Sequence, residues 1–237
     1  MVRSSISRSS AATDVLVLKP ETGKSFLSNR RIALMGMAVV VATLCAWAWS
    51  VFSIAHVVDL SADSNLTKSG LYKRWLQGDV VVMIRHGERC DRSSNPCMNG
   101  GDGITRVGSE AALAVGAGLK KLGLNKAVMI ASPTTRTQQT AERVSGHAVA
   151  TQDWVNDCDS GFKDAVVAHK NRGENLILVT HSGCIDHFER KLGVPFNERS
   201  AAYAEAVFVQ IDGTHRPRIL GSMKAGQWAD LNSEQLN

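Results

Sequence analysis

The sequence predicts an α/β fold with a mostly parallel central sheet that helices cover on both faces, preceded by one N-terminal transmembrane helix. Two observations carry this prediction. Short apolar, β-branched runs alternate with longer segments of helical period, which is typical of strand–helix–strand units. Before them lies an apolar run without Asp, Glu, Lys or Arg, residues 32–58. At about 1.5 Å per residue, this run is long enough to span a hydrocarbon core of ~30 Å.

Residues 1–31 predict a disordered tail on the cytoplasmic side of a membrane. They are rich in Ser and carry six basic and two acidic residues, so they supply most of the net charge of +5. Arg30 and Arg31 directly precede the apolar run and Asp59 follows it, so the positive-inside rule places residues 59–237 outside the cytoplasm. A cleaved signal peptide is the alternative, which the long polar start and the length of the apolar run disfavour.

The composition of the remaining chain argues against a nucleic-acid partner. Once the tail is set aside, little net charge is left, and no Lys/Arg cluster with interleaved aromatic residues follows residue 31. No internal repeat or further linker is evident, and no pattern indicates an obligate protein partner.

The segments after the apolar run predict a juxtamembrane connector, residues 59–78, and then one domain, residues 79–237. The connector is expected to contain a short helix around residues 71–76. The expected strands are 80–85, 126–131, 148–151, 175–180, 204–211 and 218–221, and the expected helices are 106–122, about 133–144, 160–171 and 184–192. Residues at the element ends support these bounds, since Thr105 can cap a helix, Ser132-Pro133 can open one and Gly123 can end one.

Three of the buried strands end in side chains suited to phosphate binding. The first ends in Arg85-His86, the helix after the second carries Arg136 in its first turn, and the third leads into His181. Because parallel strands present their carboxyl ends at one edge, where open α/β sheets bind ligands, these groups are expected to converge. Arginine offers a planar fork for phosphate oxygens, so Arg85, Arg136 and His181 form the expected phosphate pocket.

The same pocket predicts phosphoryl transfer with His86 as the nucleophile. Neutral His86 would attack phosphorus while protonated His181 and the arginines balance charge, so no metal or other cofactor is required. Asp157 is the expected general acid, and Asp159 is the second choice. Three neighbours are expected to support the site: Gly87, Glu88 and Ser182.

Four cysteines lie outside the apolar run, which fits an exported domain with disulfides. Cys90 and Cys97 flank a short polar loop and could close it, which leaves Cys158 with Cys184. Four reduced thiols or a metal site are the alternatives. Metal binding is disfavoured because no C-x-x-C or H-x-x-x-H spacing is present.

At family level, the sequence resembles the histidine phosphatase superfamily. The matching motifs are Arg85-His86-Gly87-Glu88, residues 104–108, residues 132–141 and residues 179–183. The resemblance implies a three-layer αβα sandwich, a phosphohistidine at His86 and a phosphate pocket made by Arg85, Arg136 and His181.

A closer resemblance, to bacterial lipopolysaccharide core heptose phosphate phosphatases, rests on residues 87–97, residues 103–105 and the N-terminal apolar run. It implies a single-pass protein of the bacterial inner membrane, with a periplasmic domain that hydrolyses a phosphorylated envelope sugar or glycolipid. The sequence departs from that group at Gly87, where alanine is expected, and in the loop that carries the acid. The alternatives are a phosphatase of another phosphorylated glycan or of phosphohistidine proteins, and a non-catalytic envelope protein that binds anionic glycans.

Overall fold

The computed structural model describes residues 26–52, 54–62, 64–199 and 202–231. The chain divides into two compact units, Met1–Phe52 and Ser53–Asn237. In the first unit, Phe26–Phe52 form helix α1. The predicted disordered tail lies outside the described residues except for residues 26–31, which begin α1.

The predicted transmembrane segment, residues 32–58, overlaps α1 but extends beyond its end at Phe52. Within the described ranges, the structure contains no helix that is both long and apolar enough to cross a membrane. The transmembrane helix is therefore not confirmed, and it stays a prediction.

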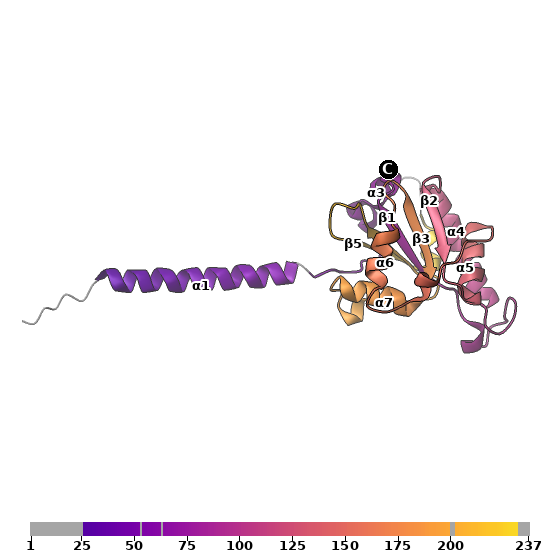
Figure 1. Cartoon of the computed structure of the whole chain (residues 1–237), viewed down its shortest axis with the longest axis horizontal. Helices are drawn as coiled ribbons and strands as arrows, with labels where there is room; N and C mark the ends of the chain where they lie inside the picture. The colour runs from indigo at the N-terminus through magenta and orange to yellow at the C-terminus, as the bar shows by residue number, and fades with distance from the viewer. Residues whose placement is uncertain (1–25, 53, 63, 200–201, 232–237) are drawn as a thin grey trace, which may run out of the picture. The chain divides into compact units, whose positions relative to one another are not determined.

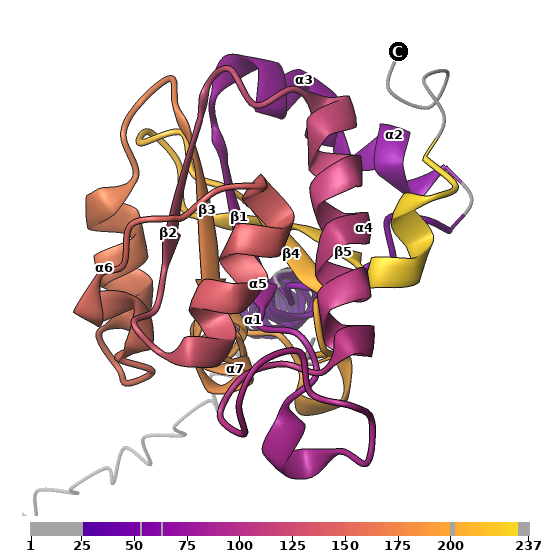
Figure 2. The ribbon, with the colours of Figure 1, turned by 90° about the vertical axis from the view of Figure 1, so that its right-hand side faces the viewer.

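The second unit is built on a five-stranded sheet with the order β2-β3-β1-β4-β5. Figure 1 labels β1, β2, β3 and β5, and Figure 2 labels β4 as well. Its strands are β1 Val80–Arg85, β2 Ala127–Ala131, β3 Asn175–Thr180, β4 Ala206–Gln210 and β5 Arg218–Met223. The central strand β1 is buried along its length, as its run of Val, Met and Ile predicts.

The prediction of a mostly parallel sheet is wrong, because the sheet is mixed. β2, β3 and β1 pair in parallel, whereas β1–β4 and β4–β5 pair antiparallel. β4 starts beside the end of β1, with Ala206 opposite Ile84, so it runs in the opposite direction. β5 then follows through a turn that contains Gly213 (φ +76°) and no crossover helix, which makes this pair a hairpin.

Helices cover both faces of the sheet, as predicted (Figure 2). They are α2 Asn65–Ser69, α3 Leu71–Gln77, α4 Arg106–Leu122, α5 Thr135–Ser145, α6 Phe162–His169 and α7 Ser182–Lys191. Short 3₁₀ helices span Cys90–Arg92, Asp153–Asn156, Phe196–Glu198 and Ala225–Trp228. Along β1, Val80, Val82 and Ile84 pack in the core with α3, α4 and α5, and Val81 and Met83 pack in the core with α6 and α7.

Residues 59–78, expected as a connector, pack as part of the domain. They form α2 and α3, whose Leu66, Leu71 and Trp75 are buried in the core. The Asp59 backbone forms a bridge with Ser222 of β5. The compact unit therefore begins well before residue 79.

Two other boundaries differ from the prediction in ways that affect the site. The expected strand 148–151 is reduced to a single bridge between Ala131 and Thr151. Thr134, not Ser132, occupies the N-cap position of α5. This leaves the Ser132 hydroxyl available for the site described below.

Replacing Gly118 with valine is expected to lower the free energy of unfolding by about 1–3 kcal/mol. A Cβ at Gly118 would overlap the buried ring of Trp228, so the ring must move. Gly226 lies beside Trp228 with open space around it, so Gly226→Val is the control and is expected to stay within about 0.5 kcal/mol of the unsubstituted protein. Urea denaturation measures both variants, and equal unfolding midpoints would contradict this packing.

Candidate active site

The end of β1 is held on both sides by its neighbours in the sheet. The backbone N–H of His86 donates to the carbonyl of Thr180 at the end of β3 (3.0 Å). The backbone N–H of Arg85 donates to the carbonyl of Glu205, just before β4 (3.1 Å). The two residues therefore sit at the carboxyl edge of the central strand, as the sequence predicts.

His86 is a buried, neutral imidazole with one nitrogen directed by the backbone of the next residue, Gly87. Its side chain is 3% exposed, and Nδ1 lies 2.8 Å from the carbonyl oxygen of Gly87. A carbonyl can only accept, so Nδ1 carries the hydrogen and Nε2 keeps its lone pair. Burial is the main cause that lowers the pKa of His86 to about 3; the Gly87 hydrogen bond opposes it and nearby cationic groups add to it. At neutral pH, Nε2 therefore keeps the free lone pair that the predicted nucleophile requires.

His181 lies beside His86 and begins a chain of hydrogen bonds. The two ring centroids are 5.5 Å apart, edge to face. Nδ1 of His181 is 3.3 Å from Nη2 of Arg136, and Nε2 is 2.9 Å from Oγ of Ser132. Arginine only donates, so Nδ1 accepts and Nε2 donates to Ser132. The Ser132 hydroxyl in turn donates to Oδ1 of Asn156 (3.3 Å).

In this structure the neutral form of His181 is favoured, whereas the protonated form is expected beside a phosphoryl group. Burial first, and then the charges of Arg136, Arg89 and Arg85, lower the pKa of His181 to about 4. His181 is therefore neutral near pH 7, and the arginines supply the positive charge of the site. The sequence predicts that these cationic side chains lie together, but it does not show how far burial and their charges lower the pKa of the His181 ring.

Arg136 lies in the first turn of α5 with part of its guanidinium buried. Within the described part of the chain, its buried Nε has no hydrogen-bond partner. One turn further on, the Thr140 hydroxyl donates to the carbonyl of Arg136 (2.6 Å) and accepts from the backbone N–H of Gly87 (2.9 Å). Thr140 thus fixes the start of α5 against the loop of His86. A buried arginine donor is suited to an anionic oxygen.

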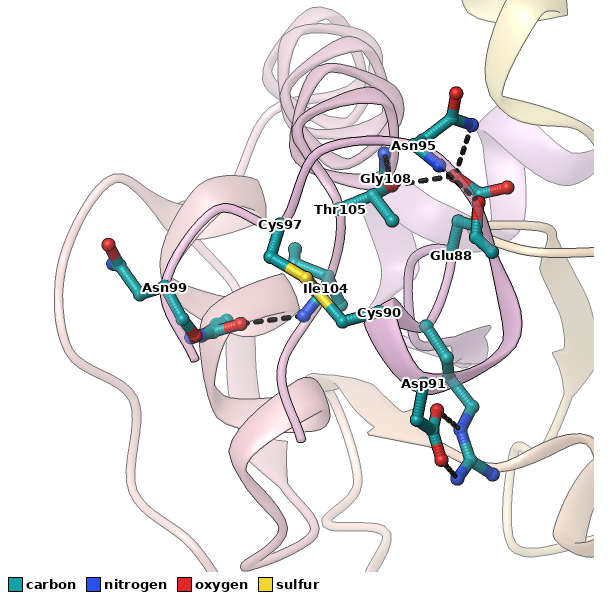
Figure 3. Close-up of a disulfide and its surroundings, with 12 residues drawn as sticks. Glu88, Cys90, Asp91, Asn95, Cys97, Asn99, Ile104, Thr105 and Gly108 are labelled. Carbon is teal, nitrogen blue, oxygen red and sulfur yellow. Dashed lines mark hydrogen bonds and ion pairs between the residues drawn. A yellow bond between two sulfur atoms is a disulfide. The ribbon is translucent and has the colours of Figure 1, made fainter. Parts of the chain in front are cut away.

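Glu88 organises the loop after His86, as expected, by accepting hydrogen bonds (Figure 3). Its Oε2 accepts from Oγ1 of Thr105 (2.6 Å) and from Nδ2 of Asn95 (2.9 Å), and these bonds lower the pKa of Glu88. Thr105 also caps α4 by accepting from the N–H of Gly108 (2.9 Å). A Cβ on Gly87 would lie 2.8 Å from the Gly108 carbonyl oxygen, so the two backbones pass close together and an alanine at residue 87 would require one of them to shift.

Both expected disulfides are present in the structure. Cys90 and Cys97 close the loop beside the site (Figure 3), with their Cα atoms 5.4 Å apart. Cys158 is bonded to Cys184 in α7. The second bond ties the loop that carries the predicted acid to the helix that Ser182 begins, directly after His181.

The two candidate acids lie in different surroundings. Oδ1 of Asp159 accepts from the backbone N–H of Gly161 (2.7 Å), so Asp159 shapes the turn before α6. Asp157 is exposed and lies between Asn156, which bonds to the serine of the His181 chain, and the disulfide-bonded Cys158. Its loop is thus tied to the site on both sides, which favours Asp157 as the proton donor.

Three side chains at the site were not predicted. Ser132 was expected only to cap a helix, although its position at the end of a strand could have indicated the site. Asn156 was read as part of a loop of candidate acids. Tyr203, whose ring lies 3.9 Å from the Arg85 guanidinium carbon, gave no local signal in the sequence.

Acid is expected to destabilise the protein below about pH 6.5, the ordinary pKa of histidine. The pKa values of His86 (about 3) and His181 (about 4) are lowered, so between these values and 6.5 the unfolded chain binds protons that the folded chain does not. The free energy of unfolding then falls as the pH is lowered through this range. Denaturant titrations from about pH 6.5 to pH 4.5 measure the fall, which is expected to shrink when both histidines are replaced with alanine. An unchanged pH dependence would contradict the assignment.

Comparisons with known proteins find sequences similar to this chain. A profile of the histidine phosphatase superfamily (branch 1) matches residues 81–162. The chain is 30% identical over 203 residues to the lipopolysaccharide core heptose(II)-phosphate phosphatase of Salmonella typhi, covering 81% of this chain and 96% of that protein. It is 31% identical over 179 residues to the protein of that name in Salmonella paratyphi B, covering 73% of this chain and 84% of the other.

A solved structure shows the same fold. The protein histidine phosphatase SixA, complexed with tungstate, superposes with a TM-score of 0.52 at 17% sequence identity. The match covers 62% of this chain and 97% of that chain.

Proposed function

Since the chain belongs to the histidine phosphatase superfamily and is a phosphatase, we propose that it releases phosphate from a phosphorylated sugar of the lipopolysaccharide core through a phosphohistidine at His86. The observation that carries the mechanism is the buried, neutral imidazole of His86, with Nδ1 tied to the Gly87 carbonyl and two arginines nearby. A nucleophile of this kind forms a covalent intermediate that divides one difficult step into two.

In the first step, Nε2 of His86 attacks phosphorus and the phosphorus–oxygen ester bond breaks. Arg85 and Arg136 stabilise the charge on the equatorial oxygens. Asp157 gives its proton to the leaving sugar oxygen. Bound phosphoryl charge also favours protonation of His181, because an opposite charge close to the ring raises its pKa.

In the second step, Asp157, now a carboxylate, takes a proton from water as the water oxygen attacks phosphorus. The nitrogen–phosphorus bond breaks, and its electron pair returns to Nε2 of His86. Inorganic phosphate leaves, and Asp157 again holds its proton. Each group is thus restored for the next cycle.

The proposed location is the bacterial inner membrane, with the N-terminus in the cytoplasm and residues 59–237 in the periplasm. The apolar run 32–58 and the preceding Arg30 and Arg31 support this orientation. Two disulfides in the second unit support an oxidising compartment. A reporter fused to the C-terminus tests the orientation, because a phosphatase reporter works only in the periplasm.

The substrate is tested with the purified full-length chain and isolated lipopolysaccharide core. Mass spectrometry is expected to show loss of one phosphate group from a core heptose, and His86→Ala is expected to remove this activity. A phosphohistidine protein and an unrelated sugar phosphate are the comparison substrates. Faster turnover of either one would contradict the proposed substrate. Core binding without phosphate release would instead support the non-catalytic alternative.

A further inference from the structure

The segment just before β4, Ala202–Glu205, lies along the end of β1. The backbone N–H of Ala204 donates to the carbonyls of Arg85 (3.1 Å) and His86 (3.3 Å). The carbonyl of Glu205 accepts from the backbone N–H of Arg85 (3.1 Å). The segment therefore contacts the backbone of both residues that carry the proposed chemistry.

The conformation of this segment is unusual at Ala204. Its φ is +52°; among the non-glycine residues that the structure describes, Ala204 is the one with a positive φ. Ala204 is completely buried, and a side-chain oxygen of Glu205 accepts from the N–H of Ala202 (2.9 Å), which closes the turn. A residue with a Cβ adopts this conformation only when its surroundings hold it there. The fold therefore determines the placement of Tyr203, directly before Ala204.

Tyr203 presents its ring to the site. The Arg85 guanidinium carbon lies 3.9 Å from the ring centroid, and the ring centroid is 5.8 Å from that of His86. Stacking uses the face of the guanidinium, whereas its N–H donors lie in the plane of the group. Stacking on Tyr203 and binding of phosphate oxygens by Arg85 are therefore compatible.

We propose that Tyr203 is a positioning residue for phosphoryl transfer, whose ring fixes the plane of the Arg85 guanidinium beside His86. This role rests on the proposed function, since it assumes that Arg85 binds the phosphoryl group. Tyr203 acts through Arg85. Its ring sets the direction of the guanidinium N–H donors, and the face of the ring attracts the guanidinium cation. The ring is needed for this role and the hydroxyl is not.

The test compares variants of the full-length chain by kcat/KM for an aryl phosphate and by inhibition with inorganic phosphate. Tyr203→Leu and Tyr203→Met remove the ring. Each is expected to lower kcat/KM about tenfold and to weaken phosphate inhibition about tenfold, which is the size of effect expected when a desolvated cation–π contact is lost. Tyr203→Phe keeps the ring and is expected to retain both values. Tyr72 is the other tyrosine of the chain and packs against the core, so Tyr72→Leu is the matched control and is expected to leave both values unchanged.

A double-mutant cycle separates positioning from general packing. When Arg85 is already alanine, Tyr203→Leu is expected to cause no further loss of phosphate binding, because the residue acts through Arg85. An equal loss in both backgrounds, or wild-type phosphate inhibition in both ring-less variants, would overturn the proposal. If the wild-type chain released no phosphate from any ester, the proposed function itself would fail. If the wild-type chain were active and the Tyr203 variants kept its kcat/KM and its phosphate inhibition, only the positioning role of Tyr203 would be contradicted.

Discussion

Replacing His86 with alanine is expected to lower phosphate release by at least about 10⁴-fold, because the variant has no nitrogen that can attack phosphorus. The substituted site keeps Arg85, Arg136 and His181, so it is expected to bind inorganic phosphate with little change. Steady-state assays with a sugar phosphate measure the loss of activity, and calorimetry measures phosphate binding.

The control for this variant is His147→Ala. His147 is exposed and hydrogen-bonds to the neighbouring Ala148 carbonyl, away from the residues of the site. This variant is expected to keep the wild-type rate. Substantial activity in His86→Ala would mean that water attacks the ester directly, which would contradict a covalent mechanism.

Replacing Asp157 with asparagine is expected to reduce hydrolysis of a sugar phosphate by about 10²–10⁴-fold, the usual contribution of a general acid–base group. An asparagine keeps the size of the side chain but has no proton to give. The loss should depend on the substrate, because a phenolate leaves without a donated proton far more readily than a sugar alkoxide. With an aryl phosphate, the variant is expected to release a burst of phenol and then stall at the phosphoenzyme.

Asp159→Asn is the matched control for Asp157→Asn. Asp159 accepts a backbone hydrogen bond at the turn before α6, and asparagine can make the same bond. Its activity is expected to equal that of the wild type for both substrates. If Asp159→Asn instead gave the burst and Asp157→Asn did not, the two roles would be exchanged.

The parts of the site that follow from local sequence patterns could be predicted from the sequence. The apolar run of β1 followed by Arg85-His86 places the proposed nucleophile at a strand end, and the ends of β2 and β3 bring Arg136 and His181 to the same edge. Parallel pairing makes this convergence a consequence of strand order alone. These residues could therefore be identified as site candidates without coordinates.

Other features depend on contacts between distant segments, which no local pattern reports. The direction of β4 follows from its antiparallel pairing with β1, and the positive φ of Ala204 is held by hydrogen bonds to the carbonyls of Arg85 and His86. Tyr203 reaches the site through its position directly before Ala204. The neutral state of His181 likewise depends on its burial and on the arginines around it.

The central claim is the phosphohistidine at His86, and trapping the phosphoenzyme tests it most directly. The full-length chain is mixed briefly with a sugar phosphate labelled on phosphorus, quenched in base, digested and analysed by mass spectrometry. The account predicts an acid-labile label on the peptide that contains His86, and on its imidazole. Phosphate release with the label on another residue, or with no labelled peptide at any quench time, would contradict it.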